Sequence, residues 1–330
     1  MGNFNFRNLE KNEYEMWDAF VDKSPQGCIF AKSFWLDAVG SKYNILGCFD
    51  KGDRMVAGMP ITQNENGYIT MPKLTQTLGI VFTDFSEMKY VKRISKEKDI
   101  IMDFVDNIPK FKNFDCSFHY NFTNWMPFMW KGYNEQTRYT YVIEDIQNME
   151  VVRGEFADKT KSVINKAIGQ NLKVVDNLTL SDMYSMLRKT FERQNMRVPF
   201  DFEWFKSFDA IINKNNSRKM FFTMDAQNNL HAALYLVYDK NCAYYLLGGA
   251  DPKFRSSGAM YLNVFEAIKY SAGFTDKFDF EGSVVPQIES MFRSFGATQK
   301  QYFRIIKNKS IMLNLKQDIR KYGKIILKRG

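Results

Sequence analysis

Apolar and polar residues follow two different periods along this chain, and together the periods predict a mixture of helices and strands. Apolar residues spaced three and four apart predict amphipathic helices, whereas short apolar runs that end at turn residues predict strands. The amino-terminal half is predicted to hold helices at 13–21 and 30–39 and strands at 44–49, 55–61 and 67–71. The other half is predicted to hold helices at 154–170, 180–195, 202–212, 258–271 and 286–295, and strands at 219–224, 230–238, 242–247, 277–280 and 301–306.

The order of these elements indicates an α/β (α+β) protein. Turn sequences at 50–53 and 225–229 each join two strands, which predicts antiparallel hairpins. The chain then alternates helix and strand, which indicates crossover connections onto the same sheet. With 330 residues the chain is long enough for two domains. We expect an amino-terminal domain over 1–150 and a carboxy-terminal domain over 151–330, each a mixed, mainly antiparallel sheet flanked by helices.

The composition is that of a globular protein, at 45% hydrophobic and 25% charged residues. No apolar run approaches the roughly 18 residues of a membrane span, and the first residues lack a signal-peptide pattern, so we expect a cytoplasmic location. Four scattered cysteines without a CxxC pair are expected to be buried, reduced thiols. The only histidines are His119 and His231, both in apolar surroundings that favour packed side chains. We therefore expect no metal site.

Charge is distributed unevenly along the chain. Residues 1–150 hold 17 basic and 20 acidic residues, a net charge of −3, whereas residues 151–330 hold 29 and 17, a net charge of +12. The last thirty residues contribute nine basic residues against Asp318 alone. An anionic partner is therefore expected to meet the second half. Apolar residues recur at helical spacing in this tail, at Met312, Leu315, Ile319, Tyr322 and Ile326.

This tail pattern predicts a basic amphipathic helix, for which three roles are open. Such a helix can rest on an anionic membrane surface, follow phosphate groups, or pack its apolar side against its own domain.

The loop before the helix predicted at 258–271 contains a candidate anion site. Unpaired backbone N–H groups at a helix start attract anions, Gly258 permits close approach of a ligand, and Arg255 adds positive charge. Ser257 and Ala259 flank the glycine. The same residues are also typical of an ordinary loop and helix cap.

Glu281 is a candidate general base, because it ends a predicted strand directly before Gly282, where side chains commonly point into a cleft. A carboxylate there can accept a proton from an attacking amine. Alternatively, it caps the following helix or pairs with Arg293. Arg293 in turn can hold an anionic group of a substrate or solvate the end of a helix.

Several motifs together resemble one known family, the Fem-type (FemABX-like) peptidoglycan bridge transferases, which belong to the wider GNAT-fold group. In the second half the matching positions are Tyr244–Gly249, Arg255, Gly258, Ala259, Tyr261, Leu262, Phe280–Ser283, Ile288 and Phe292–Gly296. In the first half and at the boundary they are Phe30, Trp35 and the segments 71–80, 138–141 and 161–174. The resemblance covers nearly the whole chain.

The resemblance implies two tandem GNAT-like domains and direct acyl transfer to an amine, without a covalent enzyme intermediate, a metal or a tightly bound cofactor. Acyl-coenzyme A or aminoacyl-tRNA would be a co-substrate. Glu281 would be the base, and Arg255, Ser257, Gly258 and Ala259 would bind the donor. Acceptor contacts would come from Arg193, Arg197, Tyr245 and Arg293.

Two features bear on the donor. The phosphate-binding signature of coenzyme A users ends in a small residue, whereas Met260 occupies that position here. Members that use tRNA often carry a long coiled-coil arm, and no heptad run of that length occurs in this chain. A half with a charge of +12 nevertheless suits a polyanion such as tRNA.

The leading hypothesis is an acyl or aminoacyl transferase that acts on an amine of a small-molecule or lipid-linked cell-envelope precursor. One alternative is a coenzyme A-dependent N-acetyltransferase of an amino sugar or amino acid. The other is a non-catalytic protein that binds tRNA, a nucleotide-sugar or an anionic lipid. The basic tail allows peripheral contact with an anionic membrane, and we expect no DNA partner.

Overall fold

The computed structural model describes residues 4–282 and 286–308, which form two compact units. Unit 1 takes its described residues from Met1–Ala31, Ser41–Arg138 and Tyr302–Gly330, and unit 2 consists of Lys32–Gly40 and Tyr139–Gln301. This division differs from the expected single cut after residue 150, because short segments of each half join the other unit. The predicted tail helix lies outside the described residues.

Unit 1 is a mixed α/β structure with a four-stranded sheet in the order β1-β2-β3-β5. Hydrogen bonds join β1, β2 and β3 as antiparallel neighbours, and the β2–β3 hairpin forms at the predicted turn. Outside this sheet, β6 pairs with β4 in parallel and with β13 in antiparallel orientation. The elements are β1 (Asn5–Asn8), η1 (Lys11–Glu13), α1 (Tyr14–Lys23), η2 (Ile29–Ala31), β2 (Asn44–Phe49), β3 (Met55–Ile61), β4 (Tyr68–Thr70), β5 (Val81–Phe82), α3 (Tyr90–Asn107), β6 (Asn113–Ser117) and α4 (Met126–Trp130), together with parts of β7 (Asn134–Ile143) and β13 (Thr298–Asn308).

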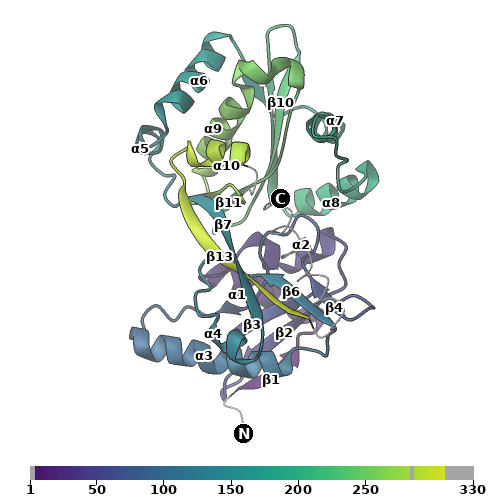
Figure 1. Ribbon diagram of the computed structural model, residues 1–330, viewed down its shortest axis with the longest axis vertical. Coiled ribbons are helices and arrows are strands. Elements are labelled where there is room, and N and C mark those ends of the chain that lie inside the picture. The colour runs from purple at the N-terminus through teal and green to yellow at the C-terminus, as the bar shows by residue number, and fades with distance from the viewer. Residues whose placement is uncertain (1–3, 283–285, 309–330) are drawn as a thin grey trace, which may run out of the picture. The chain divides into compact units, whose positions relative to one another are not determined.

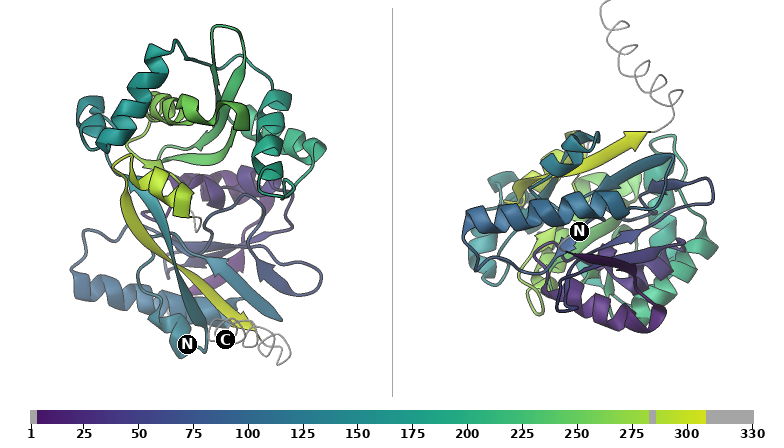
Figure 2. Two further views of the ribbon diagram at one scale, coloured as in Figure 1. Left: turned by 45° about the horizontal axis from the view of Figure 1, so that its top comes forward. Right: turned by 90° about the horizontal axis from the view of Figure 1, so that it is seen from below.

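The core of unit 1 is aromatic. Phe118 packs against Phe122 with ring centroids 4.6 Å apart, and Phe114 packs edge-on against Tyr133 at 5.3 Å. Helix α3, the long blue helix at the lower left of the left view of Figure 2, buries Ile100, Ile101 and Phe104.

Unit 2 is built on a sheet in the order β7-β12-β11-β10-β9-β8. Most neighbours are antiparallel, and β11 with β12 is a parallel pair. Its elements are α2 (Ser33–Ala38), α5 (Met149–Gly154), α6 (Asp158–Gly169), β8 (Lys173–Val175), α7 (Leu180–Glu192), α8 (Phe202–Lys214), β9 (Arg218–Met224), β10 (Leu230–Tyr238), β11 (Ala243–Ala250), η3 (Pro252–Ser257), α9 (Ala259–Ser271), β12 (Phe278–Asp279) and α10 (Pro286–Arg293).

Helices cover both faces of the unit 2 sheet. Helices α5, α6 and α9 lie on one side of it, and α7 and α8 lie on the other (Figure 1). Gly249 allows the close approach of α7, since a Cβ atom there would lie 2.5 Å from the backbone of Met186. Strand β10 is buried along almost its whole length, as a strand covered on both faces must be.

The structure confirms the predicted α/β class and its mainly antiparallel sheets. Strands β2, β3 and β10 have the predicted bounds, and α9 begins one residue after the predicted start. All four cysteines are buried free thiols, and burial raises the pKa of the Cys48 thiol to about 12. None of the described helices is long and apolar enough to cross a membrane.

Candidate functional site

Strands β11 and β12 run in parallel but pair over only two positions, Ala243 with Phe278 and Tyr244 with Asp279. Strand β12 ends there, whereas β11 continues to Ala250. The residues that follow the last pair, 245–250 on one side and 280–282 on the other, are called the fork here. Pairing between β11 and β12 stops at the fork, whereas β11 stays paired with β10 as far as Ala250. The edge of β11 that faces away from β10 can therefore serve a ligand.

Aromatic side chains fill the base of the fork. The Tyr245 ring packs edge-on against Phe292, with centroids 5.5 Å apart, and Phe292 lies 4.9 Å from Phe280. The Tyr245 hydroxyl donates to the sulfur of Met260 at 3.5 Å. Burial raises the pKa of Tyr245, so this side chain is a neutral phenol at the fork.

The backbone turns sharply at Glu281 and Gly282, where φ is 58° and 66°. A Cβ atom on Gly282 would lie 2.2 Å from the carbonyl oxygen of Tyr139, so only glycine fits this position. The Glu281 N–H donates to Oδ1 of Asp279 at 2.7 Å. These contacts fix the direction in which the Glu281 side chain leaves the strand.

The carboxyl group of Glu281 is buried, and its Oε1 atom has no hydrogen-bond partner among the described residues. Burial, and next the neighbouring Asp279, hold the pKa of this carboxyl well above its usual range. A buried carboxyl with an unused oxygen and a raised pKa has the properties of a group that exchanges protons with a ligand.

Asp279 and Thr140 hold the backbone of Glu281 in place through hydrogen bonds. The Thr140 hydroxyl donates to Asp279 Oδ1 at 2.5 Å, the same oxygen that accepts from the Glu281 N–H. Asp279 is 2% exposed. Sequence analysis missed this pair because its two members lie 139 positions apart.

Arg293 pairs with Glu289 instead of Glu281, with Nε 3.0 Å from Oε1. This oxygen also accepts from the Tyr141 hydroxyl, and the Gln299 amide donates to the Tyr141 oxygen at 2.7 Å. The Arg293 side chain remains 63% exposed. The guanidinium is thus accessible, and its contact with an acceptor stays a prediction.

The predicted anion-binding residues lie together where η3 leads into α9. Arg255 is exposed, whereas Gly258 and Ala259 are buried. Gly258 has a φ of 79°, and a Cβ atom on it would lie 2.9 Å from Val163 of α6. The Ser257 hydroxyl accepts from the Ala259 N–H at 3.3 Å. In this structure the glycine thus permits close packing of α6, and anion binding at this turn stays a prediction.

His231 holds the η3 loop in place, a role the sequence alone did not indicate. Its ring stacks on Phe254 of η3 at 3.9 Å with only 3° between the planes. On its other side, Nε2 lies 3.1 Å from Oδ2 of Asp225. Asp251, which begins the loop, accepts from the Lys189 ammonium at 2.5 Å. The expectation that His231 is a packed strand histidine is confirmed, since it is 6% exposed.

The two arginines that the resemblance assigned to the acceptor are exposed at the carboxy-terminal end of α7. Arg193 follows the last helical residue, and Arg197 lies in the loop beyond it. Within the described part of the chain, neither side chain forms a hydrogen bond or an ion pair with the fork.

A groove of about 520 Å³ lies at the other edge of the sheet, between β8, β9 and α9. Its charged groups already pair with one another, Lys219 with Asp176 and Lys269 with Glu266. It is separated from the fork by β10 in the strand order and is not part of the candidate site.

No protein-family model matches the sequence, and no curated protein is detectably similar to it in sequence. Solved structures are similar in fold. The crystal structure of FemX superimposes with a TM-score of 0.68 and 11% identity, over 91% of this chain and 96% of the other.

Two further structures have the same fold with lower scores. A tandem GNAT protein from the clavulanic acid biosynthesis pathway matches with a TM-score of 0.54 and 8% identity, over 92% of this chain and 97% of that one. L-PGS from Bacillus licheniformis matches with a TM-score of 0.54 and 10% identity, over 95% and 97%. The chain therefore has the tandem GNAT-like fold of FemX, as the sequence resemblance implied.

Proposed function

We propose that this chain is an acyl or aminoacyl transferase, which moves an acyl group from an activated donor to an amine of a cell-envelope precursor. The proposal rests on Glu281, a buried carboxyl with an unpartnered oxygen and a raised pKa beside the fork. The fold supports it, because it matches FemX and a tandem GNAT protein, and the sequence resemblance to Fem-type transferases implies acyl transfer.

The proposed reaction needs few protein groups. The amine nitrogen forms a bond to the donor's carbonyl carbon, the carbon–oxygen or carbon–sulfur bond to the carrier breaks, and the leaving group takes up a proton. The amine loses its proton to the ionised carboxylate of Glu281. A raised pKa brings this carboxylate closer to the pKa of an amine, which favours the transfer. Backbone N–H groups of the fork would stabilise the oxyanion.

The remaining assignments belong to the same proposal. Arg255, Ser257, Gly258 and Ala259 would bind the phosphate groups of the donor. Arg193, Arg197, Tyr245 and Arg293 would contact the acceptor, with the neutral phenol of Tyr245 packed at the base of the fork. We keep the cytoplasmic location expected from the sequence.

The donor is tested by incubating the protein with charged tRNA or with acyl-coenzyme A and candidate amine acceptors. Product is detected by mass spectrometry. Acyl transfer from tRNA would select the aminoacyl transferase. Transfer from coenzyme A would select the N-acetyltransferase, against which Met260 counts, because it replaces the small residue that ends the coenzyme A signature. No product with either donor, while tRNA or a nucleotide-sugar still binds, would support the non-catalytic alternative.

The role of Glu281 is tested by Glu281→Gln. The amide has the same shape but cannot accept a proton, so turnover should fall by roughly 10²–10⁴-fold while donor binding stays unchanged. Glu289→Gln is a matched control, since Glu289 contacts Tyr141 and Arg293 at the surface. If turnover of the Glu281 variant equals that of the native protein, Glu281 is structural.

A further inference from the structure

The side chain of Tyr245 lies along β11 and covers Gly248. A Cβ atom on Gly248 would overlap the Tyr245 hydroxyl oxygen and would lie 2.6 Å from the ring carbon that carries it. The φ of Gly248 is not in the left-handed region, so the backbone conformation alone does not require a glycine. The glycine is required here because the tyrosine ring occupies the place of its side chain.

Side chains from two helices hold the Tyr245 ring in this position. Its hydroxyl donates to the sulfur of Met260, the second residue of α9, at 3.5 Å. Phe292 of α10 packs edge-on against the ring, with centroids 5.5 Å apart. Tyr245 and Met260 are half-buried, whereas the preceding residues Tyr244 and Ala259 are buried. The contact between Tyr245 and Met260 therefore lies at the border of the core, where a ligand from solution can meet it.

This contact joins the two places that the proposed function gives to the donor. Met260 follows Ala259, the last of the four residues proposed to bind its phosphate groups. Tyr245 is the first fork residue of β11, and Glu281 lies on the other side of the fork. A donor with its phosphate groups at the start of α9 and its acyl group at the fork would therefore run past this contact. An oxygen and a sulfur 3.5 Å apart touch, so no further atom fits between them.

The two candidate donors differ in how they would span this distance. Acyl-coenzyme A carries its acyl group at the end of a slender, flexible arm, and its phosphate groups lie at the other end of that arm. Such an arm needs an open channel between β11 and α9. An aminoacyl-tRNA carries its amino acid directly on the ribose of its terminal nucleotide and has no arm to insert.

We propose that Tyr245 is a specificity-determining residue, whose ring keeps the arm of acyl-coenzyme A out of the space between β11 and α9. A side chain that clashes with the wrong ligand is a common source of specificity. The ring is fixed by contacts with Met260 and Phe292, and Gly248 makes room for it. The inference rests on the proposed function for the two ends of the donor, and within that function it selects the aminoacyl transferase.

The test measures binding of coenzyme A itself by isothermal titration calorimetry, without an acyl group or an acceptor. The native protein should not bind it measurably, whereas Tyr245→Ala should bind it at least roughly tenfold more tightly. Tyr261→Ala is the matched control, because it removes a tyrosine ring that stacks on Phe295 at 5.7 Å, next to Met260 in the sequence. It should behave as the native protein does. A gain of binding cannot arise from a loss of folding.

Gly248→Ala displaces the same ring without removing it, and it serves the test even if Tyr245→Ala folds poorly. The added methyl group overlaps the Tyr245 hydroxyl, which must leave its place on β11. This variant should also gain coenzyme A binding. Combined with Tyr245→Ala, it should add nothing, because the ring that it displaces is already absent.

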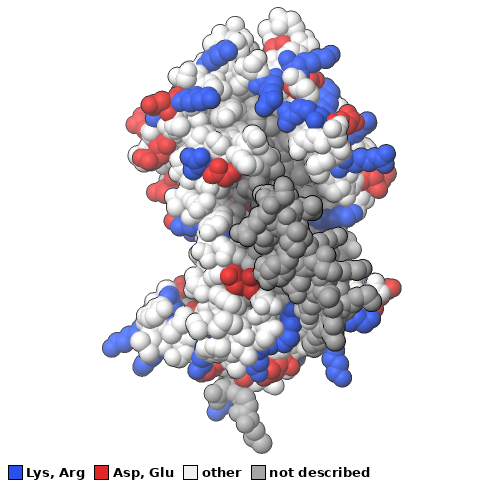
Figure 3. Space-filling view, viewed as in Figure 1, with Lys and Arg blue, Asp and Glu red and all other residues white. Residues whose placement is uncertain are grey.

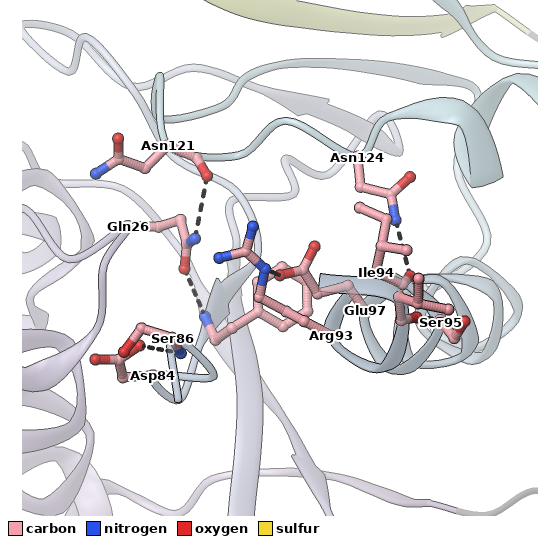
Figure 4. A network of polar contacts seen from close by, with 11 residues as sticks. Gln26, Asp84, Ser86, Arg93, Ile94, Ser95, Glu97, Asn121 and Asn124 are labelled. Carbon is pink, nitrogen blue, oxygen red and sulfur yellow. Dashed lines mark hydrogen bonds and ion pairs between the residues drawn. The ribbon is translucent and has the colours of Figure 1, made fainter. Parts of the chain in front are cut away.

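Surface bases can also attract coenzyme A through its phosphate groups. Lys and Arg side chains are scattered over the visible face of the molecule (Figure 3). In unit 1, for example, the Arg93 side chain is 39% exposed, with its Nε 3.8 Å from Oε1 of Glu97 (Figure 4). Pantetheine, which is the arm without phosphate groups, separates the two effects. It should bind Tyr245→Ala more tightly than the native protein, and Arg93→Gln should show no such gain.

Equal coenzyme A binding by the native protein and Tyr245→Ala would overturn the proposal, and so would the absence of binding by both Tyr245→Ala and Gly248→Ala. A gain with coenzyme A but not with pantetheine would assign the gain to surface charge and would also overturn it. None of these measurements involves acyl transfer. A chain that transfers no acyl group would therefore refute the proposed function without changing the result of this test.

Discussion

Ionisation of Glu281 lowers the free energy of unfolding, and this loss grows as the pH rises. Its pKa in the folded protein is raised by burial and by Asp279, so the folded state keeps the proton after the unfolded chain has released it. The contribution of Glu281 to the stability of the native protein should therefore fall as the pH rises above about 4.3, the ordinary value for glutamate. Glu281→Gln removes this loss. In thermal unfolding, its stability relative to the native protein should increase from pH 4 to pH 8.

Glu289→Gln should show the opposite trend. Hydrogen bonds from Tyr141 and Arg293 lower the pKa of Glu289. Its contribution to stability is therefore present above the ordinary pKa and lost as the pH falls through the lowered value. This variant should be less stable than the native protein at pH 7 and nearly equal to it in strong acid. If both variants follow the same pH trend, the assigned environment of Glu281 is wrong.

The sequence allowed Glu281 to be chosen, but not its supporting residues. A glutamate before a glycine at a strand end is visible in the sequence. The hydrogen bond from Thr140 to Asp279 joins two strands that are distant in the chain, and no local pattern indicates it. In the same way, the sequence left open whether Glu281 pairs with Arg293, and only the structure places Arg293 on Glu289, four residues earlier in α10.

At the level of elements, Gly258 determines how closely α6 approaches the start of α9. Its φ of 79° is unfavourable for any residue with a Cβ atom, and such an atom would lie 2.9 Å from Val163. Gly258→Ala should lower the free energy of unfolding by roughly 1–3 kcal/mol. Gly154→Ala in α5 is the matched control, because nothing lies within 4 Å of its added methyl group. Chemical denaturation of both variants measures the difference.

An alanine at 258 that leaves stability unchanged would contradict the packing described for α6. If the alanine variant is less stable and also binds the donor more weakly, Gly258 serves both the packing of α6 and donor binding. Donor binding that survives the substitution would leave Gly258 as a packing residue only.

The helices and strands predicted from the sequence were those with strong local patterns. The hairpins of β2–β3 and β9–β10 have clear turn residues between alternating or apolar runs. Helix α3 was not predicted, since charged residues interrupt its sequence and only Ile100, Ile101 and Phe104 are buried. Strand β6 was also missed, because its stabilisation comes from pairing with β13, nearly 200 positions away.

At the level of the whole molecule, the two units exchange segments in a way that composition cannot reveal. Strand β7 begins in unit 1 and ends in unit 2, and β13 begins in unit 2 and pairs with β6 in unit 1. A domain boundary predicted from the sequence is placed between two predicted elements. Here the boundaries after Arg138 and after Gln301 lie inside strands β7 and β13. The sequence could therefore indicate two domains, but not which terminal segment belongs to which.

The uneven charge leads to a last prediction, which concerns binding of tRNA. The last thirty residues supply a net +8 of the +12 carried by residues 151–330. Within them Arg304 is already paired with Asp115 and Lys307 with a backbone carbonyl, so the remaining bases lie beyond the described strands. Each phosphate that a base neutralises adds about 0.9 to the slope of log affinity against log salt for a duplex.

We expect unfractionated tRNA to bind with a steep salt dependence. A full-length variant with glutamine at six basic tail positions should lose more than half of the measured slope in fluorescence anisotropy titrations; the changes are at 316, 320, 321, 324, 328 and 329. Lys89→Gln with Lys92→Gln, on exposed positions of unit 1, is the control and should leave the slope nearly unchanged. An equal slope in the tail variant would assign the polyanion contacts to the described surface of unit 2, where Arg193, Arg197 and Arg255 are exposed.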